Sequence, residues 1–238
     1  MEQNSFRKGI VDGLPICIGY FAVSFAFGIF AVSKGLTWLE AVLISMTNLT
    51  SAGQLAGVPI IAGGGTFAEL AISQLVINSR YSLMSVSLSQ RLSGRVKLWQ
   101  RFIIAFGNTD EIFAVATANP NMVGEKYMYG LILTPLLGWT GGTLLGAVAG
   151  DILPAIVVTS LGVAIYGMFI AIVVPQIKRE RSAAVCAGIA VAFSCALYYV
   201  PVIREIPDGF KIIICAIAAA LIAAILFPIG KKEGEAND

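Results

Sequence analysis

Polar residues gather in three clusters inside otherwise apolar stretches, where each polar side chain needs a partner or a task. The first cluster runs from Ser45 to Gln54 and includes Asn48, Ser51 and Gly53. A helix break in this cluster would expose backbone N–H groups and a half-helix end, which can bind a carboxylate. Hydrogen bonding between closely packed helices is the alternative. The cluster therefore predicts either a binding site or a packing seam.

The second cluster places a positive charge deep inside an apolar stretch. Gln74 and Asn78 are four residues apart and share a helix face that continues to Tyr81. Arg80 lies about ten residues from the nearer helix end, which corresponds to a depth of roughly 15 Å. A guanidinium at that depth needs an anion from Asp, Glu or a substrate carboxylate. The cluster predicts a structural ion pair or a substrate-binding cation.

The third cluster contains two adjacent acids, Asp110 and Glu111, which follow Asn108 and Thr109. Adjacent residues point to different sides of a helix, so the two carboxylates are expected to have different roles. Such groups can bind a cation, hold Arg80 or take up a proton. The alternative is an interfacial helix whose two acids lie in water.

Composition indicates that lipid is the solvent for much of the surface. Of the 238 residues, 57% are hydrophobic and only 13% are charged, whereas soluble domains carry about 25% charged residues. Lipid requires internally paired backbone groups, and long apolar runs then mean helices rather than barrel strands. The sequence predicts an all-α, polytopic transmembrane bundle, with residues 1–238 forming a single transmembrane domain.

Several classes of function are disfavoured by residues that the chain lacks. There is no histidine, which removes Ser-His and Cys-His catalysis and the common haem and zinc sites. The four cysteines form no CxxC pair, and we expect no metal and no cofactor. The net charge of +2 comes without a basic block that would indicate nucleic acid. A membrane enzyme acting on lipid is therefore a minor alternative.

Eight apolar runs and four basic spots define the expected topology. The basic spots should all face the cytoplasm, so an even number of crossings must separate them. Three runs lie between the first two spots, and three lie between the next two. One run of each set must then fail to cross, and the polar 38–62 and the short acidic 102–118 are the candidates. The runs are 9–32, 38–62, 66–90, 102–118, 127–149, 154–177, 183–202 and 210–229; the spots are Arg7/Lys8, Arg91/Arg95/Lys97/Arg101, Lys178/Arg179/Arg181 and Lys231/Lys232.

This pattern predicts six full crossings and two interrupted or re-entrant segments, with residues 1–8 and 231–238 in the cytoplasm. The alternative is eight crossings with the loop 91–101 outside. A loose internal repeat pairs the glycines of 19–28 and the stretch from Ser45 to Gly53 with those of 138–146 and 160–167. Transporters often contain internal repeats.

The polar clusters carry a resemblance to a known family. The sequence resembles the AzlC family, the large subunits of bacterial branched-chain amino acid exporters. The matching stretches occur in family order over residues 9–118 and are Gly13-Leu14-Pro15 with Gly19 and Gly28, Ser51-Ala52-Gly53-Gln54, Val76-Ile77-Asn78-Ser79-Arg80-Tyr81 running to Ser87-Leu88, and Thr109-Asp110-Glu111-Ile112-Phe113-Ala114.

The chain departs from the family pattern at two places. The family commonly reads alanine-glycine-serine-alanine before the glutamine, where this chain has Thr50-Ser51-Ala52-Gly53. That difference could alter the polarity of the pocket and hence the substrate. The family often has histidine after the arginine, where this chain has Tyr81, so a proton step on histidine is not available there.

The resemblance implies proton-linked export of valine, leucine or isoleucine from a multi-pass protein of the bacterial inner (cytoplasmic) membrane. It also implies a small, membrane-embedded partner of the AzlD type. The expected substrate-binding residues are Asn48, Ser51, Gly53, Gln54, Asn78, Arg80 and Tyr81, and the expected proton-coupling residues are Asp110 and Glu111. The alternatives are an uncoupled, channel-like conduit, an exporter of another small solute, and a non-transporting assembly subunit.

Overall fold

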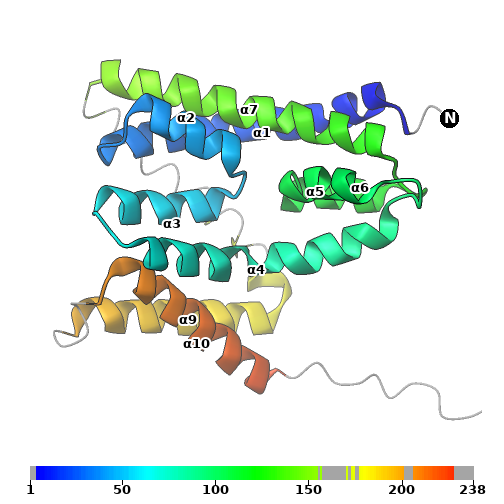
Figure 1. Ribbon diagram of the computed structural model, residues 1–238. Coiled ribbons are helices and arrows are strands. Elements are labelled where there is room, and N and C mark those ends of the chain that lie inside the picture. Colours follow the sequence, from blue (N-terminus) through cyan, green and yellow to red (C-terminus); the bar gives the residue numbers. More distant parts are fainter. Residues whose placement is uncertain are drawn as a thin grey trace, which may run out of the picture. The chain divides into compact units, whose positions relative to one another are not determined.

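The computed structural model describes residues 4–154, 156, 170, 173–174, 177–200 and 206–227. The chain divides into two compact units, Met1–Met168 and Phe169–Asp238. The described residues form helices and contain no β-strand beyond an isolated bridge, which confirms the all-α prediction. The described helices of the first unit (Figure 1) are α1 (Phe6–Ser33), α2 (Trp38–Thr47), α3 (Ser51–Ala62), α4 (Phe67–Arg91), α5 (Leu98–Phe106), α6 (Asp110–Ala118) and α7 (Glu125–Ile152).

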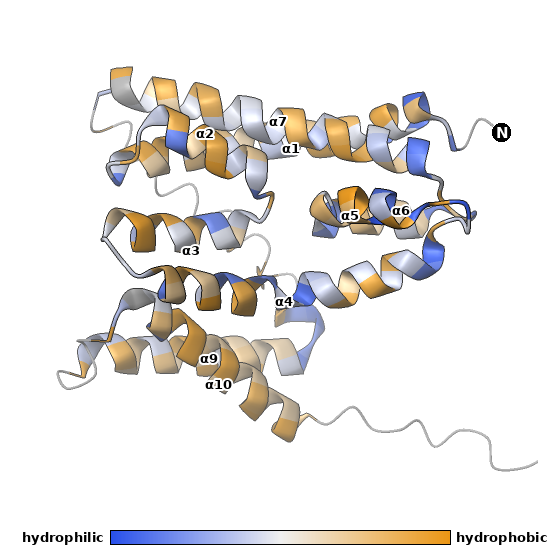
Figure 2. Ribbon diagram, viewed as in Figure 1, coloured by the Kyte–Doolittle hydropathy of each residue, from blue (hydrophilic) through white to orange (hydrophobic). Residues whose placement is uncertain are grey.

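Two long helices, α1 and α7, run side by side in the same direction. Gly9 of α1 lies against Gly130 near the start of α7, and Phe25 lies against Gly146 near its end. Glycine at these positions lets the two backbones approach closely, as in many membrane helix pairs. Both helices are long and apolar enough to cross a membrane, and most of their ribbon in Figure 2 is coloured between white and the orange of hydrophobic residues. The pair supports the shorter helices of this unit.

Replacement of Gly146 by alanine is expected to destabilise the first unit by about 1–3 kcal/mol, the usual cost of overpacking. A Cβ at this position would collide with the backbone of Phe25. The matched control is Gly141→Ala on the same helix, where a Cβ would meet no atom within 4 Å. Thermal unfolding of the purified variants in detergent measures the difference. Equal melting temperatures would contradict the close approach of α1 and α7.

The stretch 38–62 forms two short helices, α2 and α3, that fold back on each other as a hairpin (Figure 1). Residues 48–50 between them are not helical. At the base of the hairpin, Val58 of α3 packs in the same buried cluster as Leu36 and Ala41. Both ends of the hairpin therefore lie at one end of the unit. The prediction of an interrupted, re-entrant segment is confirmed.

The stretch 102–118 belongs to a second hairpin, made by α5 and α6 with the non-helical residues 107–109 at its tip. The chain that enters α5 meets the chain that leaves α6. The N–H of Ser93 donates to the carbonyl of Val123 over 2.9 Å, and the N–H of Val123 donates to the carbonyl of Arg91 over 3.0 Å. This segment is interrupted as predicted, although its first helix begins at Leu98, four residues earlier than the apolar run.

The long helix α4 runs in the opposite direction to α1. Asn4, just before α1, and Leu92, just after α4, both contact residues 122–123, so the start of α1 and the end of α4 lie at the same end of the unit. Each long helix is followed by a hairpin at the end where it finishes. Within the first unit, residues 6–62 and 67–118 thus form two segments of opposite direction, each made of a long helix and a hairpin. Inverted repeats of this kind are common in transporters.

The glycine spacing from which a repeat is predicted reflects the packing of α1 against α7. Its stretches 19–28 and 138–146 lie side by side in α1 and α7, where their glycines let the helices pack closely. The stretch 160–167 of that repeat lies outside the described residues. The inverted pair of helix-plus-hairpin units has no clear counterpart in the sequence, because a shared fold needs only a shared pattern of apolar lengths and breaks.

The second unit contains α9 (Arg181–Tyr199) and α10 (Asp208–Leu226), which pack against each other. Both are long and apolar enough to cross a membrane. With α1 and α7 they make four described helices that are long and apolar enough to cross a membrane, and these match four of the six predicted crossings. The predicted run 66–90 forms the 25-residue helix α4, which is less apolar. Most of the predicted run 154–177 lies outside the described residues.

Candidate functional site

The two hairpins bring their non-helical tips to the middle of the first unit. The α2–α3 and α5–α6 hairpins enter from opposite ends, and α3 and the α5–α6 pair lie between α4 and the α1–α7 pair (Figure 1). The tips contact residues near the middle of the long helices, Tyr20 of α1 and Gln74 of α4. Non-helical backbone at lipid depth is tolerated where protein or a water-filled cavity surrounds it. The tips therefore mark a polar centre within the unit.

An ion pair joins α4 to the tip of the second hairpin. Arg80 Nη1 donates to Asp110 Oδ2 over 2.5 Å, and Arg80 Nη2 donates to the Tyr81 hydroxyl over 3.0 Å. The guanidinium also lies 4.7 Å from the centre of the Tyr81 ring. Asp110 is the first residue of α6, where the helix dipole favours a negative charge. The predicted anion for Arg80 is thus Asp110, and both side chains stay about half exposed, at 50% and 48%.

The neighbouring acid, Glu111, faces a different helix, as predicted for adjacent residues. Glu111 Oε2 lies 2.5 Å from the Tyr20 hydroxyl of α1, and Thr109 Oγ1 lies 2.6 Å from the same hydroxyl. A phenol has one proton, so Tyr20 can donate to only one of these oxygens at a time. The tip of the second hairpin is therefore tied to α4 by a charge pair and to α1 by hydrogen bonds with the Tyr20 hydroxyl.

Gln54 ties the first hairpin to α7. Its side-chain oxygen accepts from Trp139 Nε1 over 3.0 Å, and its nitrogen donates to Ser45 Oγ over 3.0 Å. Ser45 Oγ in turn lies 2.7 Å from Thr143 Oγ1. Gln54 and Trp139 are each only 2% exposed. This buried network uses the hydrogen-bonding groups of Gln54 to fix the position of α3.

A chain of amides links the tip of the first hairpin to α4. Gln74 Nε2 donates to the carbonyl of Gly53 over 2.9 Å, and Asn78 Nδ2 donates to Gln74 Oε1 over 3.1 Å. A Cβ at Gly53 would lie 2.6 Å from Gln74 Oε1 and 3.2 Å from Asn78 Nδ2. Glycine at this position leaves room for the amide groups of Gln74 and Asn78, which a larger residue would displace. The shared helix face predicted for Gln74 and Asn78 is confirmed.

The first break itself is shaped by Asn48. Its Oδ1 accepts from the N–H of Thr50 over 3.2 Å and from the Thr50 hydroxyl over 2.6 Å. Thr50 makes no side-chain capping bond to α3. The first N–H groups of α3, beginning at Ser51, have no partner within the helix and no side-chain cap. They form a half-helix end with a partial positive charge.

Two buried amide oxygens near the hairpin tips lack a donor within the described residues. These are Asn78 Oδ1 on α4 and Asn108 Oδ1 in the second break. The other side-chain atom of Asn108, Nδ2, donates to Ser85 Oγ over 3.2 Å. A buried acceptor without a partner costs about 1–3 kcal/mol. Each oxygen is thus suited to a group rich in donors, such as water or an ammonium.

The structure distributes the predicted residues over several places. Arg80, Tyr81 and Asp110 form one group, Gly53 and Asn78 are linked through Gln74, and Gln54 points to α7. Asn48 lies in the first break, Ser51 begins α3, and Glu111 faces α1. Within the described residues, no group of three or more His, Cys, Asp or Glu side chains is placed to hold a metal ion.

Two residues of this centre are missed by sequence reasoning. Tyr20 is a single tyrosine in the middle of an apolar run, and its position at mid-helix is the signal that could identify it. Trp139 likewise lies near the middle of α7, where a tryptophan that anchors at a membrane interface is not expected. Both residues face the hairpins, and their rings pack edge to face with centres 5.1 Å apart.

The fold and the site define a multi-pass, α-helical membrane protein in which the tips of two helical hairpins meet, one of them held by an ion pair to α4. The chain belongs to the AzlC family, whose family description, AzlC protein, matches residues 15–153. This match covers more than half of the chain and confirms the resemblance seen in the sequence motifs.

Similar proteins come from bacteria and an archaeon. The inner membrane protein YgaZ of Escherichia coli is 32% identical over 229 residues, which cover 92% of this chain and 91% of that protein. A membrane protein of Archaeoglobus fulgidus is 32% identical over 191 residues, covering 79% and 84%. The branched-chain amino acid transport protein AzlC of Bacillus subtilis is 24% identical over 194 residues, covering 79% and 75%. No solved structure matches the chain.

Proposed function

We propose that the chain exports valine, leucine or isoleucine in exchange for protons, together with a small AzlD-type membrane subunit. Membership of the AzlC family and the name of the Bacillus subtilis relative, a branched-chain amino acid transport protein, support this function. The observation that carries the proposal is the half-exposed ion pair between Arg80 and Asp110 at the tip of a re-entrant hairpin. Charged groups at such depth mark a substrate or ion path.

An amino acid zwitterion carries the same two charges as the ion pair that it would interrupt. Its carboxylate would bind Arg80 and the N–H groups that begin α3 at Ser51 and continue to Gly53. Its ammonium would bind Asp110 and the Oδ1 of Asn78, which lacks a donor in this structure. Each charge keeps a partner during the exchange, which avoids the large penalty of an unpaired buried charge.

Three of the expected binding residues act on this site through their neighbours. Tyr81 holds the guanidinium of Arg80 by its hydroxyl and its ring. Asn48 shapes the break that exposes the start of α3, and Gln54 fixes α3 against α7. We therefore assign positioning roles to these three residues.

Glu111 is the better candidate for the coupling proton. Protonation of Asp110 would leave Arg80 without its anion, whereas Glu111 faces the neutral hydroxyl of Tyr20. While Glu111 is ionised, Tyr20 donates to it. Once Glu111 is protonated, its own O–H can donate to Tyr20, whose proton can then turn to Thr109. Protonation would thus redirect a hydrogen bond between α1 and the hairpin tip.

The proposal places the protein in the cytoplasmic membrane with both termini in the cytoplasm. The basic residues Arg7 and Lys8 lie in the first turn of α1, and four further basic residues lie between 91 and 101. Contacts of Asn4 and Leu92 with residues 122–123 place both basic spots at the same end of the first unit. An excess of Lys and Arg in short loops is typical of the cytoplasmic side.

The function is tested in proteoliposomes that contain the chain and an AzlD-type subunit. A pH gradient is expected to drive valine accumulation by about tenfold over liposomes with equal pH on both sides, because each unit of pH can support a tenfold concentration ratio for one proton exchanged. Flux that ignores the gradient would indicate an uncoupled conduit instead. Absence of flux, with no stabilisation of the chain by valine in thermal unfolding, would indicate an assembly subunit.

A further inference from the structure

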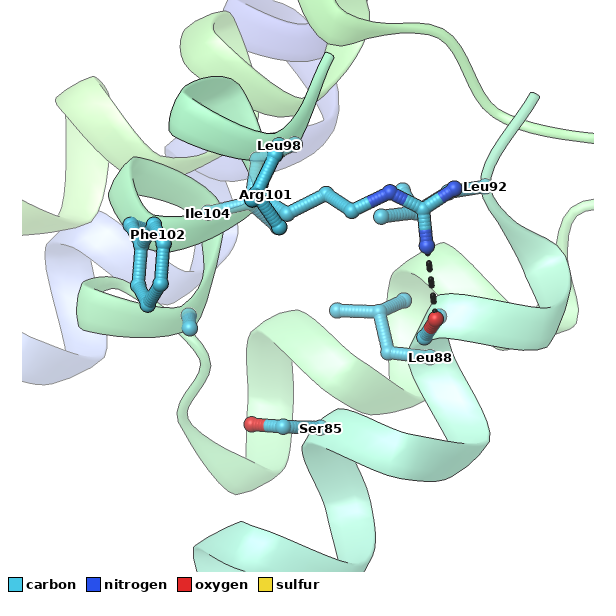
Figure 3. Close-up of a pocket in the computed structure, with 9 residues that line it drawn as sticks. Ser85, Leu88, Leu92, Leu98, Arg101, Phe102 and Ile104 are labelled. Atoms are coloured by element: carbon cyan, nitrogen blue, oxygen red, sulfur yellow. Dashed lines mark hydrogen bonds between the residues drawn. The ribbon is translucent and has the colours of Figure 1, made fainter. Parts of the chain in front are cut away.

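A hollow lies between the last turns of α4 and the helix α5, at the end of the first unit that holds the N-terminus. Its floor is apolar and buried, with Leu88 at 2% exposed and Ile104 at 1% exposed. Its outer wall is apolar and open, with Leu98 at 71% and Phe102 at 69% exposed. Figure 3 shows these residues around the hollow. An apolar hollow of this kind can accommodate an acyl chain of the surrounding lipid.

One cation lines this apolar hollow. Arg101 reaches from α5 toward α4, where its Nη1 donates to Ser89 Oγ over 2.7 Å (Figure 3). Its Nε lies 3.4 Å from the carbonyl of Val96. These two contacts hold the guanidinium in place with neutral acceptors only. Nη2 makes no hydrogen bond within the described part of the chain, so Arg101 can still bind an anion.

The segment around the hollow carries a positive charge without a compensating negative one. Arg91, Arg95 and Lys97 precede Arg101, and the sequence contains no Asp or Glu between residues 70 and 109. The ion pairs Lys8–Asp12 and Arg80–Asp110 do not involve this segment. Trp99 of α5 is 57% exposed, as expected for a tryptophan at a membrane interface. An anionic partner would complement this positive charge.

We propose that this hollow binds an anionic phospholipid, whose phosphate contacts Arg101 and one of whose acyl chains lies along the apolar floor. Basic pockets between membrane helices on the cytoplasmic side bind anionic headgroups, and arginine is well suited to phosphate because its guanidinium can make paired hydrogen bonds. The site is separate from the Arg80–Asp110 pair and does not depend on which solute is transported. A bound lipid would hold α5 against α4 and so support the second hairpin.

Native mass spectrometry of the delipidated full-length chain tests the site with two lipids of equal chain length. Phosphatidylglycerol is expected to bind at least about tenfold more tightly than phosphatidylcholine, a difference that titration resolves well. Two variants should each remove this preference: Arg101→Gln, which deletes the cation, and Ala105→Leu, which fills the hollow without changing any charge. Ala105 lines the hollow and is exposed, so its variant should fold even if loss of the Arg101–Ser89 bond unfolds the other.

The matched control is Arg95→Gln, which removes one positive charge of the same loop at an exposed residue outside the hollow. It should keep most of the preference for phosphatidylglycerol. Equal effects of Arg95→Gln and Arg101→Gln, together with no effect of Ala105→Leu, would show attraction to the basic loop in general and overturn the proposal. Competition by inorganic phosphate at millimolar concentration, or formation of a lipid-insensitive dimer in the same spectra, would also overturn it.

Discussion

Arg80→Gln should lower gradient-driven valine transport by about 100-fold, which corresponds to roughly 2.7 kcal/mol. The variant removes the proposed partner of the substrate carboxylate and leaves Asp110 without a cation at lipid depth. Transport is measured in proteoliposomes with equal amounts of protein. The matched control is Arg91→Gln at the end of the same helix, where the guanidinium contacts the carbonyl of Thr117. The control should retain transport within about twofold, since less than 0.5 kcal/mol separates such rates.

A charge-swapped pair separates a role in transport from a purely structural ion pair. Arg80→Asp combined with Asp110→Arg restores opposite charges in contact, apart from a helix-dipole penalty of about 0.3–1 kcal/mol for a cation at the start of α6. We expect the swap to recover the thermal stability that each single variant loses, but not transport, because the site would then present reversed charges to the zwitterion. Recovery of both properties would show that the ion pair only supports the fold.

The interrupted segments could be predicted because a membrane allows few solutions. Basic loops on one side require an even number of crossings between them, and the basic segment 91–101 follows three apolar runs. One of these three runs therefore cannot cross the membrane. The run 38–62 is the best candidate because its middle is polar. The same argument selected 102–118. The structure breaks these stretches at residues 48–50 and 107–109.

The partners across the site could not be predicted in the same way. Residue spacing defines which side chains share a helix face, but it contains no information about which helix lies opposite. The sequence leaves several anions possible for Arg80, of which Asp110 is one. The role proposed for Glu111 depends on its hydrogen bond with Tyr20, which lies 91 residues away in the chain. Gln54 similarly depends on Trp139 at a separation of 85 residues.

The predicted binding residues also differ in whether their polar side-chain atoms remain free to bind a ligand. Gln54 is buried with both amide atoms bonded, and Asn48 uses its oxygen within the break. By contrast, Arg80 and Asp110 are half exposed, and Asn78 retains an acceptor without a donor. A polar residue in a predicted break can support the break or bind a ligand. Residue type alone does not distinguish these roles, whereas the hydrogen-bond partners do.

Glu111→Gln is expected to separate substrate binding from proton coupling. Glutamine keeps the size of the side chain and can accept a hydrogen bond from Tyr20, but it cannot exchange a proton. Valine exchange between equal concentrations on both sides should therefore continue within about threefold of the wild-type rate, while accumulation driven by a pH gradient should fall at least about tenfold. Both quantities are measured in the same proteoliposomes. Unchanged gradient-driven accumulation would remove Glu111 from the coupling mechanism.

The hydroxyl of Tyr20 provides an independent check on this mechanism. Tyr20→Phe keeps the ring against Trp139 but deletes the hydroxyl that lies between Glu111 and Thr109. We expect the same selective loss of gradient-driven accumulation, because protonation of Glu111 could no longer redirect a bond between α1 and the hairpin tip. The matched control is Tyr129→Phe, which deletes a buried hydroxyl that has no hydrogen-bond partner within the described residues. If both variants behaved alike, the effect would come from tyrosine loss in general and not from the link between Tyr20 and Glu111.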